Sequence, residues 1–197
     1  MNKIGIFGGS FNPVHLGHAN AVTNAYEQLG LDMVYAVVSN VPPHKQLKNA
    51  PDAQIRLEMA KLAFEDLPYV QVSDIELSRG QVSYTVDTIA GIRQLHPGAR
   101  IYLIVGYDMF VTLDKWKDAE RIFADAAIGF IYREKDENAD KIKTDYEVRF
   151  GAEIEYINAR IVNVSSTEIR DLLKAGKRPN LLQDNVYNYI KERKLYE

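Results

Sequence analysis

The segment that most constrains this chain is Gly8-Gly9-Ser10-Phe11-Asn12-Pro13-Val14-His15-Leu16-Gly17-His18. It follows a short apolar run at residues 3–7 and leads into residues 16–29, which have helical periodicity, so it is predicted to be a turn from a buried strand into a helix. Open α/β sheets bind phosphates at such turns, because backbone N–H groups are unpaired at a helix N-terminus and glycine permits close approach to an anion. The sequence therefore predicts a phosphate site here.

Two histidines, His15 and His18, stand three residues apart on one side of this helix start, and Gly17 leaves space between them. Either as cations or as N–H donors, both side chains can bond phosphate oxygens while negative charge builds up on a five-coordinate phosphorus. A lone histidine at such a place more often caps or packs the first turn. The pair beside Gly8 and Gly9 favours the phosphate interpretation.

Strands and helices alternate along the rest of the chain. Apolar runs predict strands at 32–39, 69–73, 101–105, 127–132, 154–157 and 160–164, and helices are predicted at about 15–29, 52–66, 84–95, 118–124, 165–175 and 183–194. The charged residues 135–143 are expected to form a mobile loop or an exposed helix start. This order predicts a Rossmann-like α/β fold: a doubly wound, mostly parallel sheet flanked by helices in a single domain, residues 1–197, with a helical C-terminal portion from about 165 to 197 packed on it.

Capping residues set the expected helix limits. Asp52, Ser83 and Ser165 are placed to accept hydrogen bonds from the first turns of three helices, and Ser165 has the capping-box spacing to Glu168. Gly30 suits the left-handed position after the first helix.

Length and composition exclude several classes of protein. The 197 residues carry a net charge of −3 with both signs interspersed, so no general nucleic-acid or membrane surface is expected. The absence of cysteine excludes disulfides and thiolate nucleophiles. Without a leader-like start or an apolar run of about 18 residues, the chain is expected to be cytoplasmic. The sequence leaves the oligomeric state open, a homo-oligomer included.

Motifs that are missing narrow the chemistry further. The chain has no Gly-x-x-x-x-Gly-Lys-Ser/Thr phosphate loop and no Gly-x-Gly-x-x-Gly dinucleotide fingerprint, which disfavours P-loop enzymes and Rossmann dehydrogenases. It also lacks the Gly-x-Ser-x-Gly elbow and the His-Glu-x-x-His zinc motif of hydrolases.

The 8–18 turn resembles the signature of the nucleotidyltransferase superfamily related to class I aminoacyl-tRNA synthetases. Four further stretches, together with this turn, resemble bacterial nicotinate-nucleotide adenylyltransferases over residues 3–196: Pro42-Pro43-His44-Lys45, Ser83-Tyr84-Thr85-Val86-Asp87-Thr88, Gly106-Tyr107-Asp108 with Trp116, and Val164-Ser165-Ser166-Thr167-Glu168-Ile169-Arg170. Asn12 departs from the more common aspartate and Tyr107 from the usual alanine. Neither change overturns the resemblance.

The resemblance implies a role for each of these stretches. Catalysis would rest on His15, His18, Lys45 and Arg170. ATP would be bound by Gly8, Gly9, Ser10, Phe11, His15, Gly17, His18, Ser165, Ser166, Thr167 and Arg170. Nicotinate mononucleotide would be bound by Asn12, Lys45, Tyr84, Thr85, Gly106, Asp108 and Trp116, with the indole as a stacking face for the pyridine ring. No protein side chain is expected to bind a metal, and Mg²⁺ would arrive on the phosphates of ATP.

The expected reaction transfers the adenylyl group of ATP to nicotinate mononucleotide, forming nicotinate adenine dinucleotide and pyrophosphate on the route to NAD. The acceptor phosphate would attack the α-phosphorus directly, without a covalent intermediate. Alternatives are a pantetheine-phosphate adenylyltransferase, a preference for the amide mononucleotide, and a non-catalytic nucleotide sensor. A class I synthetase is disfavoured because 197 residues leave no room for a tRNA-reading domain.

Overall fold

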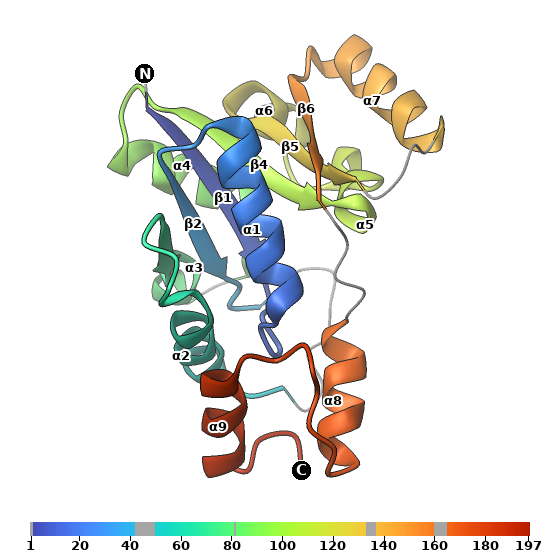
Figure 1. Ribbon diagram of the computed structural model, residues 1–197. Helices are drawn as coiled ribbons and strands as arrows, with labels where there is room; N and C mark the ends of the chain where they lie inside the picture. The colour runs from blue at the N-terminus through green and yellow to red at the C-terminus, as the bar shows by residue number, and fades with distance from the viewer. Residues whose placement is uncertain (1, 42–49, 81, 133–136, 160–164) are drawn as a thin grey trace.

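The computed structural model describes residues 2–41, 50–80, 82–132, 137–159 and 165–197 (Figure 1). Within these residues, six parallel strands form one sheet in the order β3-β2-β1-β4-β5-β6. The strands are β1 (Lys3–Gly9), β2 (Met33–Val38), β3 (Val70–Ser73), β4 (Arg100–Gly106), β5 (Ala127–Tyr132) and β6 (Ile154–Asn158). The predicted Rossmann-like sheet is thus confirmed, and all its described pairings are parallel.

The strand order reverses between β1 and β4. The chain runs outward from β1 to β3, returns to lay β4 against the free side of β1, and continues outward to β6. Open α/β sheets bind ligands beyond the carboxyl ends of strands at such a switch point. The 8–18 turn leaves β1 at this point.

Helices cover both faces of the sheet (Figure 1). They are α1 (Leu16–Leu29), α2 (Ala53–Phe64), α3 (Ile75–Arg79), α4 (Thr85–Leu95), α5 (Tyr107–Phe110), the 3₁₀ helix η1 (Leu113–Lys115), α6 (Ala119–Asp125), α7 (Glu137–Phe150), α8 (Ser166–Lys174) and α9 (Asp184–Glu192). Buried residues of α1, α2, α8 and α9 form one core with the sheet, and those of α4, α6 and α7 form a second core on the opposite face. None of the described helices has the length and apolar character needed to cross a membrane.

Strand β4 shows why the central strands are apolar throughout. Tyr102 and Ile104 belong to the first core, whereas Ile101, Leu103 and Val105 belong to the second. Successive side chains of a strand point to opposite faces, so a strand covered on both sides needs an unbroken apolar run.

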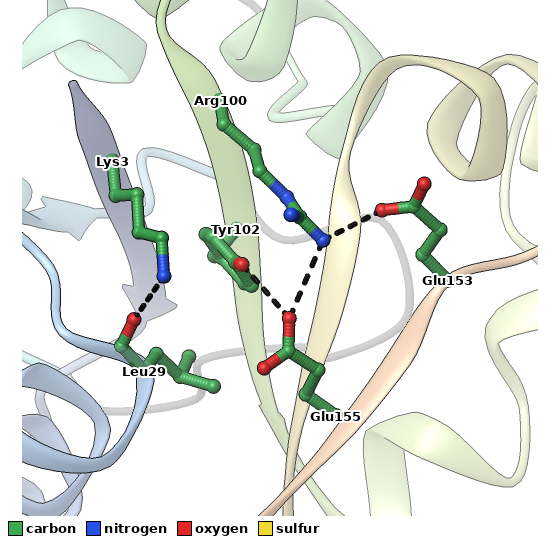
Figure 2. Close-up of polar contacts among 6 residues, drawn as sticks. All are labelled: Lys3, Leu29, Arg100, Tyr102, Glu153 and Glu155. Carbon is green, nitrogen blue, oxygen red and sulfur yellow. Dashed lines mark hydrogen bonds and ion pairs between the residues drawn. The ribbon is translucent and has the colours of Figure 1, made fainter. Parts of the chain in front are cut away.

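A polar cluster lies at the end of the sheet where β4 begins (Figure 2). Because β1 and β4 are parallel, this end is opposite the 8–18 turn, which follows the end of β1. The Arg100 guanidinium donates to Glu153 at 2.8 Å and to Glu155 at 3.4 Å, and the Tyr102 hydroxyl donates to the same Glu155 oxygen at 2.8 Å. Burial and the bond to Glu155 raise the pKa of Tyr102 to about 12. The cluster therefore joins β4 to β6, and to Glu153 directly before β6, across the intervening strand β5.

Several predicted helix limits are confirmed. The Asp52 carboxylate accepts the N–H of Ile55 at 2.9 Å, and Gly30 has φ 60° after α1. At the start of α8, Ser165 accepts the N–H of Glu168 at 3.1 Å and donates its own N–H to the Glu168 carboxylate at 2.8 Å.

One predicted helix cap is wrong. Ser83 does not cap α4: Tyr84 is the N-cap residue, and the Ser83 hydroxyl accepts the N–H of Asn40 at 3.0 Å instead. Of the two alternatives predicted for residues 135–143, the helix start is confirmed and the mobile loop is not: residues 137–143 form the first half of α7, whose sparse apolar face buries Ala139 and Tyr146. The strand predicted at 160–164 lies outside the described residues.

Candidate active site

The 8–18 turn is fixed mainly by burial of its apolar residues. Phe11 and Val14 are fully buried, and the Phe11 ring meets the ring of Phe64 edge-on at 5.9 Å. A Cβ at Gly9 would lie 3.1 Å from the Phe11 ring, so glycine lets this ring fold back under the strand end. Phe11, predicted to bind ATP, therefore places its ring in the core and leaves its backbone at the turn.

The two histidines of the turn lie face to face. Their ring centroids are 3.7 Å apart, with 35° between the ring planes, and His18 also packs edge-on against Phe11 at 5.2 Å. The backbone N–H of His15, the N-cap residue of α1, donates to Nδ1 of His18 at 3.2 Å. Because this nitrogen accepts a hydrogen bond, the neutral His18 ring carries its proton on Nε2.

Burial settles the charge of both rings in the free protein. It lowers the pKa of His15 to about 4 and lowers that of His18 well below its usual value, with the neighbouring His15 lowering it further. Both imidazoles are therefore neutral at pH 7. Of the two states that the sequence allows, N–H donor rather than cation is the state of the free site.

The start of α8 docks on the same turn. The Ser166 hydroxyl donates to the Pro13 carbonyl at 3.0 Å, and the Arg170 guanidinium donates to the Asn12 carbonyl at 2.7 Å and to the Thr167 hydroxyl at 3.0 Å. The bonds to the Pro13 and Asn12 carbonyls join residues separated by more than 150 positions in the chain. The structure thus brings two of the predicted ATP-binding segments together, and the N–H groups at the start of α8 lie beside the turn.

Arg56 is a buried residue of the site region that the sequence analysis missed. Arg56 is only 2% exposed. Its guanidinium group donates hydrogen bonds to three carbonyl oxygens: Ser10 at 2.7 Å, Asn40 at 3.2 Å and Pro51 at 3.3 Å. It connects α2 to the turn and to the end of β2. The signal was present, because position 56 falls on the helical stripe of Met59, Ala60 and Ala63, where an apolar residue is expected.

Some of the predicted acceptor residues lie at the carboxyl end of β4, directly after it, and at the start of α4. Gly106 ends β4, Asp108 is exposed on α5, and Thr85 is the first residue of α4. The Lys117 ammonium lies 4.2 Å from the centroid of the Tyr84 ring, at the N-cap of α4. Lys117 was also missed, and its position directly after Trp116 was the available signal.

Trp116 is not joined to the histidine pair by any described contact. It is partly buried and lines a cavity of about 650 Å³ with residues of η1, α6 and the end of α7: Asp114, Asp118, Ala119, Glu120, Arg121, Arg149 and Phe150. No residue of the 8–18 turn lines this cavity. Lys45, predicted to serve both catalysis and nucleotide binding, lies outside the described residues.

The remaining predicted residues take ordinary positions in the turn and in α1. Gly8 belongs to the end of β1, Ser10 follows it with its carbonyl held by Arg56, and Gly17 lies in the first turn of α1. In the part of the chain that the structure covers, no group of three His, Cys, Asp or Glu side chains is arranged to hold a metal ion.

Comparison with known proteins identifies the family. Residues 6–172 match the cytidylyltransferase-like family. The probable nicotinate-nucleotide adenylyltransferase of Clostridium tetani is 34% identical over 200 residues, and the nicotinate-nucleotide adenylyltransferase of Bacillus subtilis is 35% identical over 198 residues; both matches cover 100% of both chains. The chain belongs to the nicotinate-nucleotide adenylyltransferases, within the cytidylyltransferase-like family. It is therefore a nucleotidyltransferase, and the family expected from its motifs is confirmed.

Solved structures support the same fold. Plasmodium falciparum nicotinic acid mononucleotide adenylyltransferase complexed with NaAD has a TM-score of 0.81 at 21% identity, covering 100% of this chain and 98% of that one. The same enzyme complexed with APC has a TM-score of 0.79 at 20% identity, with the same coverage.

Proposed function

We propose that this nucleotidyltransferase joins ATP and nicotinate mononucleotide to give nicotinate adenine dinucleotide and pyrophosphate, a step in NAD biosynthesis. One observation carries the proposal: the start of α8 binds the same 8–18 turn that holds the His15–His18 pair. The turn and the helix N-terminus both present N–H donors, which suit the phosphates of ATP. The names of the full-length relatives supply the substrates.

The proposed chemistry is a direct in-line displacement. A 5′-phosphate oxygen of the mononucleotide attacks the α-phosphorus of ATP, the new P–O–P bond forms, and the bond to the β-phosphate oxygen breaks to release pyrophosphate. The acceptor is already an anion, so no protein nucleophile is needed. His15 and His18 donate N–H hydrogen bonds to the charge that develops on the phosphate oxygens, and this stabilises the transition state.

The other predicted residues hold the triphosphate. The N–H groups and hydroxyls of Ser165, Ser166 and Thr167 bind its oxygens at the start of α8, and Arg170 and Lys45 add positive charge. In the free protein Arg170 also holds the Asn12 carbonyl, so ATP would bind to a guanidinium that is already oriented.

Mg²⁺ is proposed to enter with ATP. The residues described around the turn are N–H donors rather than a carboxylate cage, which fits an ion bound through phosphate oxygens and water. When bound, the ion would neutralise charge on the triphosphate. The chain's own contribution remains the alignment of the phosphates by α8 and the turn.

The start of α4 is proposed to select the acid form of the mononucleotide. The unpaired N–H groups of a helix N-terminus favour a carboxylate over a neutral amide. Lys117 adds a positive charge at the ring of Tyr84, the N-cap residue. Both features favour nicotinate over nicotinamide at this position.

The test is pyrophosphate release from ATP and Mg²⁺ with nicotinate mononucleotide, nicotinamide mononucleotide or pantetheine phosphate as acceptor. We expect turnover with the acid mononucleotide to exceed turnover with the amide, and no turnover with pantetheine phosphate. A higher rate with either of the other acceptors would replace the proposed substrate. ATP binding without turnover on any of the three would indicate a nucleotide sensor.

A further inference from the structure

The penultimate residue of the chain, Tyr196, folds back into the interior beneath the 8–18 turn. It is 9% exposed, and its hydroxyl donates to Oδ1 of Asn12 at 2.7 Å, an oxygen of a residue that is itself 5% exposed. The two residues are 184 positions apart. A hydrogen bond between two buried side chains so far apart in the sequence holds the segment at residue 196 against the turn.

The backbone at both ends of this contact is strained. Phe11, next to Asn12, has φ 44°, and Tyr196 has φ 65°. Residues other than glycine reach this left-handed region at a cost, and they stay there only when their surroundings hold them. The turn that carries the histidines is therefore not a conformation that its own sequence would keep alone.

Besides Ser166, which binds the Pro13 carbonyl, three side chains from distant parts of the chain hold this turn. Arg56 binds the Ser10 carbonyl at 2.7 Å, Arg170 binds the Asn12 carbonyl at 2.7 Å, and Tyr196 binds the Asn12 side chain. The two guanidinium groups act on backbone oxygens, which every residue has. The Tyr196 bond is specific to the residue at position 12.

The Tyr196 hydroxyl keeps its proton and so stays a hydrogen-bond donor to Asn12. Burial raises its pKa above the usual value, and this outweighs the opposite effect of the nearby Arg170 and Arg56 charges. The segment is anchored directly before Tyr196, since the N–H of Leu195 binds the Ile190 carbonyl at 3.0 Å. Tyr196 therefore reaches Asn12 from a fixed base on α9.

We infer that Tyr196 is a positioning residue, which holds the 8–18 turn through its hydrogen bond to Asn12 and so sets the placement of His15 and His18. The structural part of this inference stands on the contact itself. Its catalytic consequence rests on the proposed function, because the histidines must be placed against the phosphates of ATP.

The first experiment compares Tyr196→Phe with the control Tyr189→Phe. The phenylalanine at 196 keeps the buried ring and removes the donor. Tyr189 lies on α9 with its ring against Arg193, and its hydroxyl makes no hydrogen bond within the described residues. Hydrogen exchange followed by mass spectrometry should show the peptide over residues 8–14 exchanging roughly tenfold faster in Tyr196→Phe, with α9 unchanged, because the turn loses a local restraint. Tyr189→Phe should match the wild type.

The catalytic readout separates positioning from binding. Misplacement of a catalytic group lowers kcat, so Tyr196→Phe should lose about tenfold in kcat while KM for ATP changes little. Asn12→Ala breaks the same bond from the other side, and adding Tyr196→Phe to it should cause no further change in exchange of residues 8–14. If Tyr196→Phe folds poorly, Asn12→Ala tests the same bond on its own, through the exchange of residues 8–14.

The outcomes are distinct. Unchanged exchange at residues 8–14 in Tyr196→Phe, or additive effects of the two substitutions, would overturn the inference. If the wild-type protein shows no adenylyl transfer, the proposed function fails, but faster exchange in the turn would still establish the restraint.

Discussion

The rings of His15 and His18 lie against each other with their centroids 3.7 Å apart and their planes tilted by 35°, inside a site that keeps both rings neutral. Contact at this distance is compatible with two neutral imidazoles and opposed by two cations. The free turn is therefore arranged as a pair of hydrogen-bond donors, and acid should disturb it.

Acid should destabilise the protein through His15. Its pKa is about 4 in the folded state and 6.5 ordinarily, so between these values the unfolded chain binds the proton more readily. The stability contributed by the neutral ring is complete above pH 6.5 and declines as the pH falls to about 4, with a loss of about 3 kcal/mol. Urea unfolding of wild type and His15→Gln across this range measures it. Equal losses in the two proteins would contradict the expectation.

Removal of the His18 side chain should slow the reaction strongly. By analogy with the loss of one donor to a developing oxyanion, His18→Ala should lower kcat about 10²–10³-fold, measured as pyrophosphate release. The matched control is His96→Ala, since His96 follows α4 and binds the Tyr35 hydroxyl at 2.8 Å, away from the turn. Near-normal turnover by His18→Ala would remove this histidine from the mechanism.

Replacement of Arg56 should destabilise the fold. Arg56→Met leaves three carbonyl oxygens without their charged donor, so the free energy of unfolding should fall by about 3 kcal/mol in urea titration. Arg121→Met is the control, because that side chain is 63% exposed and pairs with Asp125 at the surface. Its effect should stay within about 0.5 kcal/mol. Similar losses in both variants would argue against the role of burial.

Lys117 should contribute to the choice between acid and amide. Lys117→Gln removes the charge at the Tyr84 ring, so KM for nicotinate mononucleotide should rise roughly two- to fivefold, as expected for a charge near a helix end, while KM for the amide stays constant. Lys115→Gln, an exposed lysine at the end of η1, serves as control. An equal change for both mononucleotides in Lys117→Gln would indicate a general effect on binding.

Features that depend on neighbouring residues in the chain were predictable. The caps at Asp52 and Ser165 and the glycine after α1 follow from hydrogen bonds and backbone freedom within one helical turn. The sheet follows from alternating apolar runs and helical stripes. For residues 135–143 the sequence left a loop and a helix start both open, because the buried face of α7 is short of apolar residues and its charges resemble a loop. The prediction that Ser83 caps α4 was wrong because the Ser83 hydroxyl instead accepts the N–H of Asn40, which follows β2.

The sequence by itself determined the class of fold and the family to which the chain belongs, and it predicted a phosphate site at the 8–18 turn, because each of these depends on patterns of residues that are close together in the chain. Only the tertiary structure decided how that turn is held and charged. Burial makes His15 and His18 neutral, and burial is a property of the packed molecule. Arg56, Arg170 and Tyr196 reach the turn from 46, 158 and 184 positions away, across contacts that arise only when the chain packs.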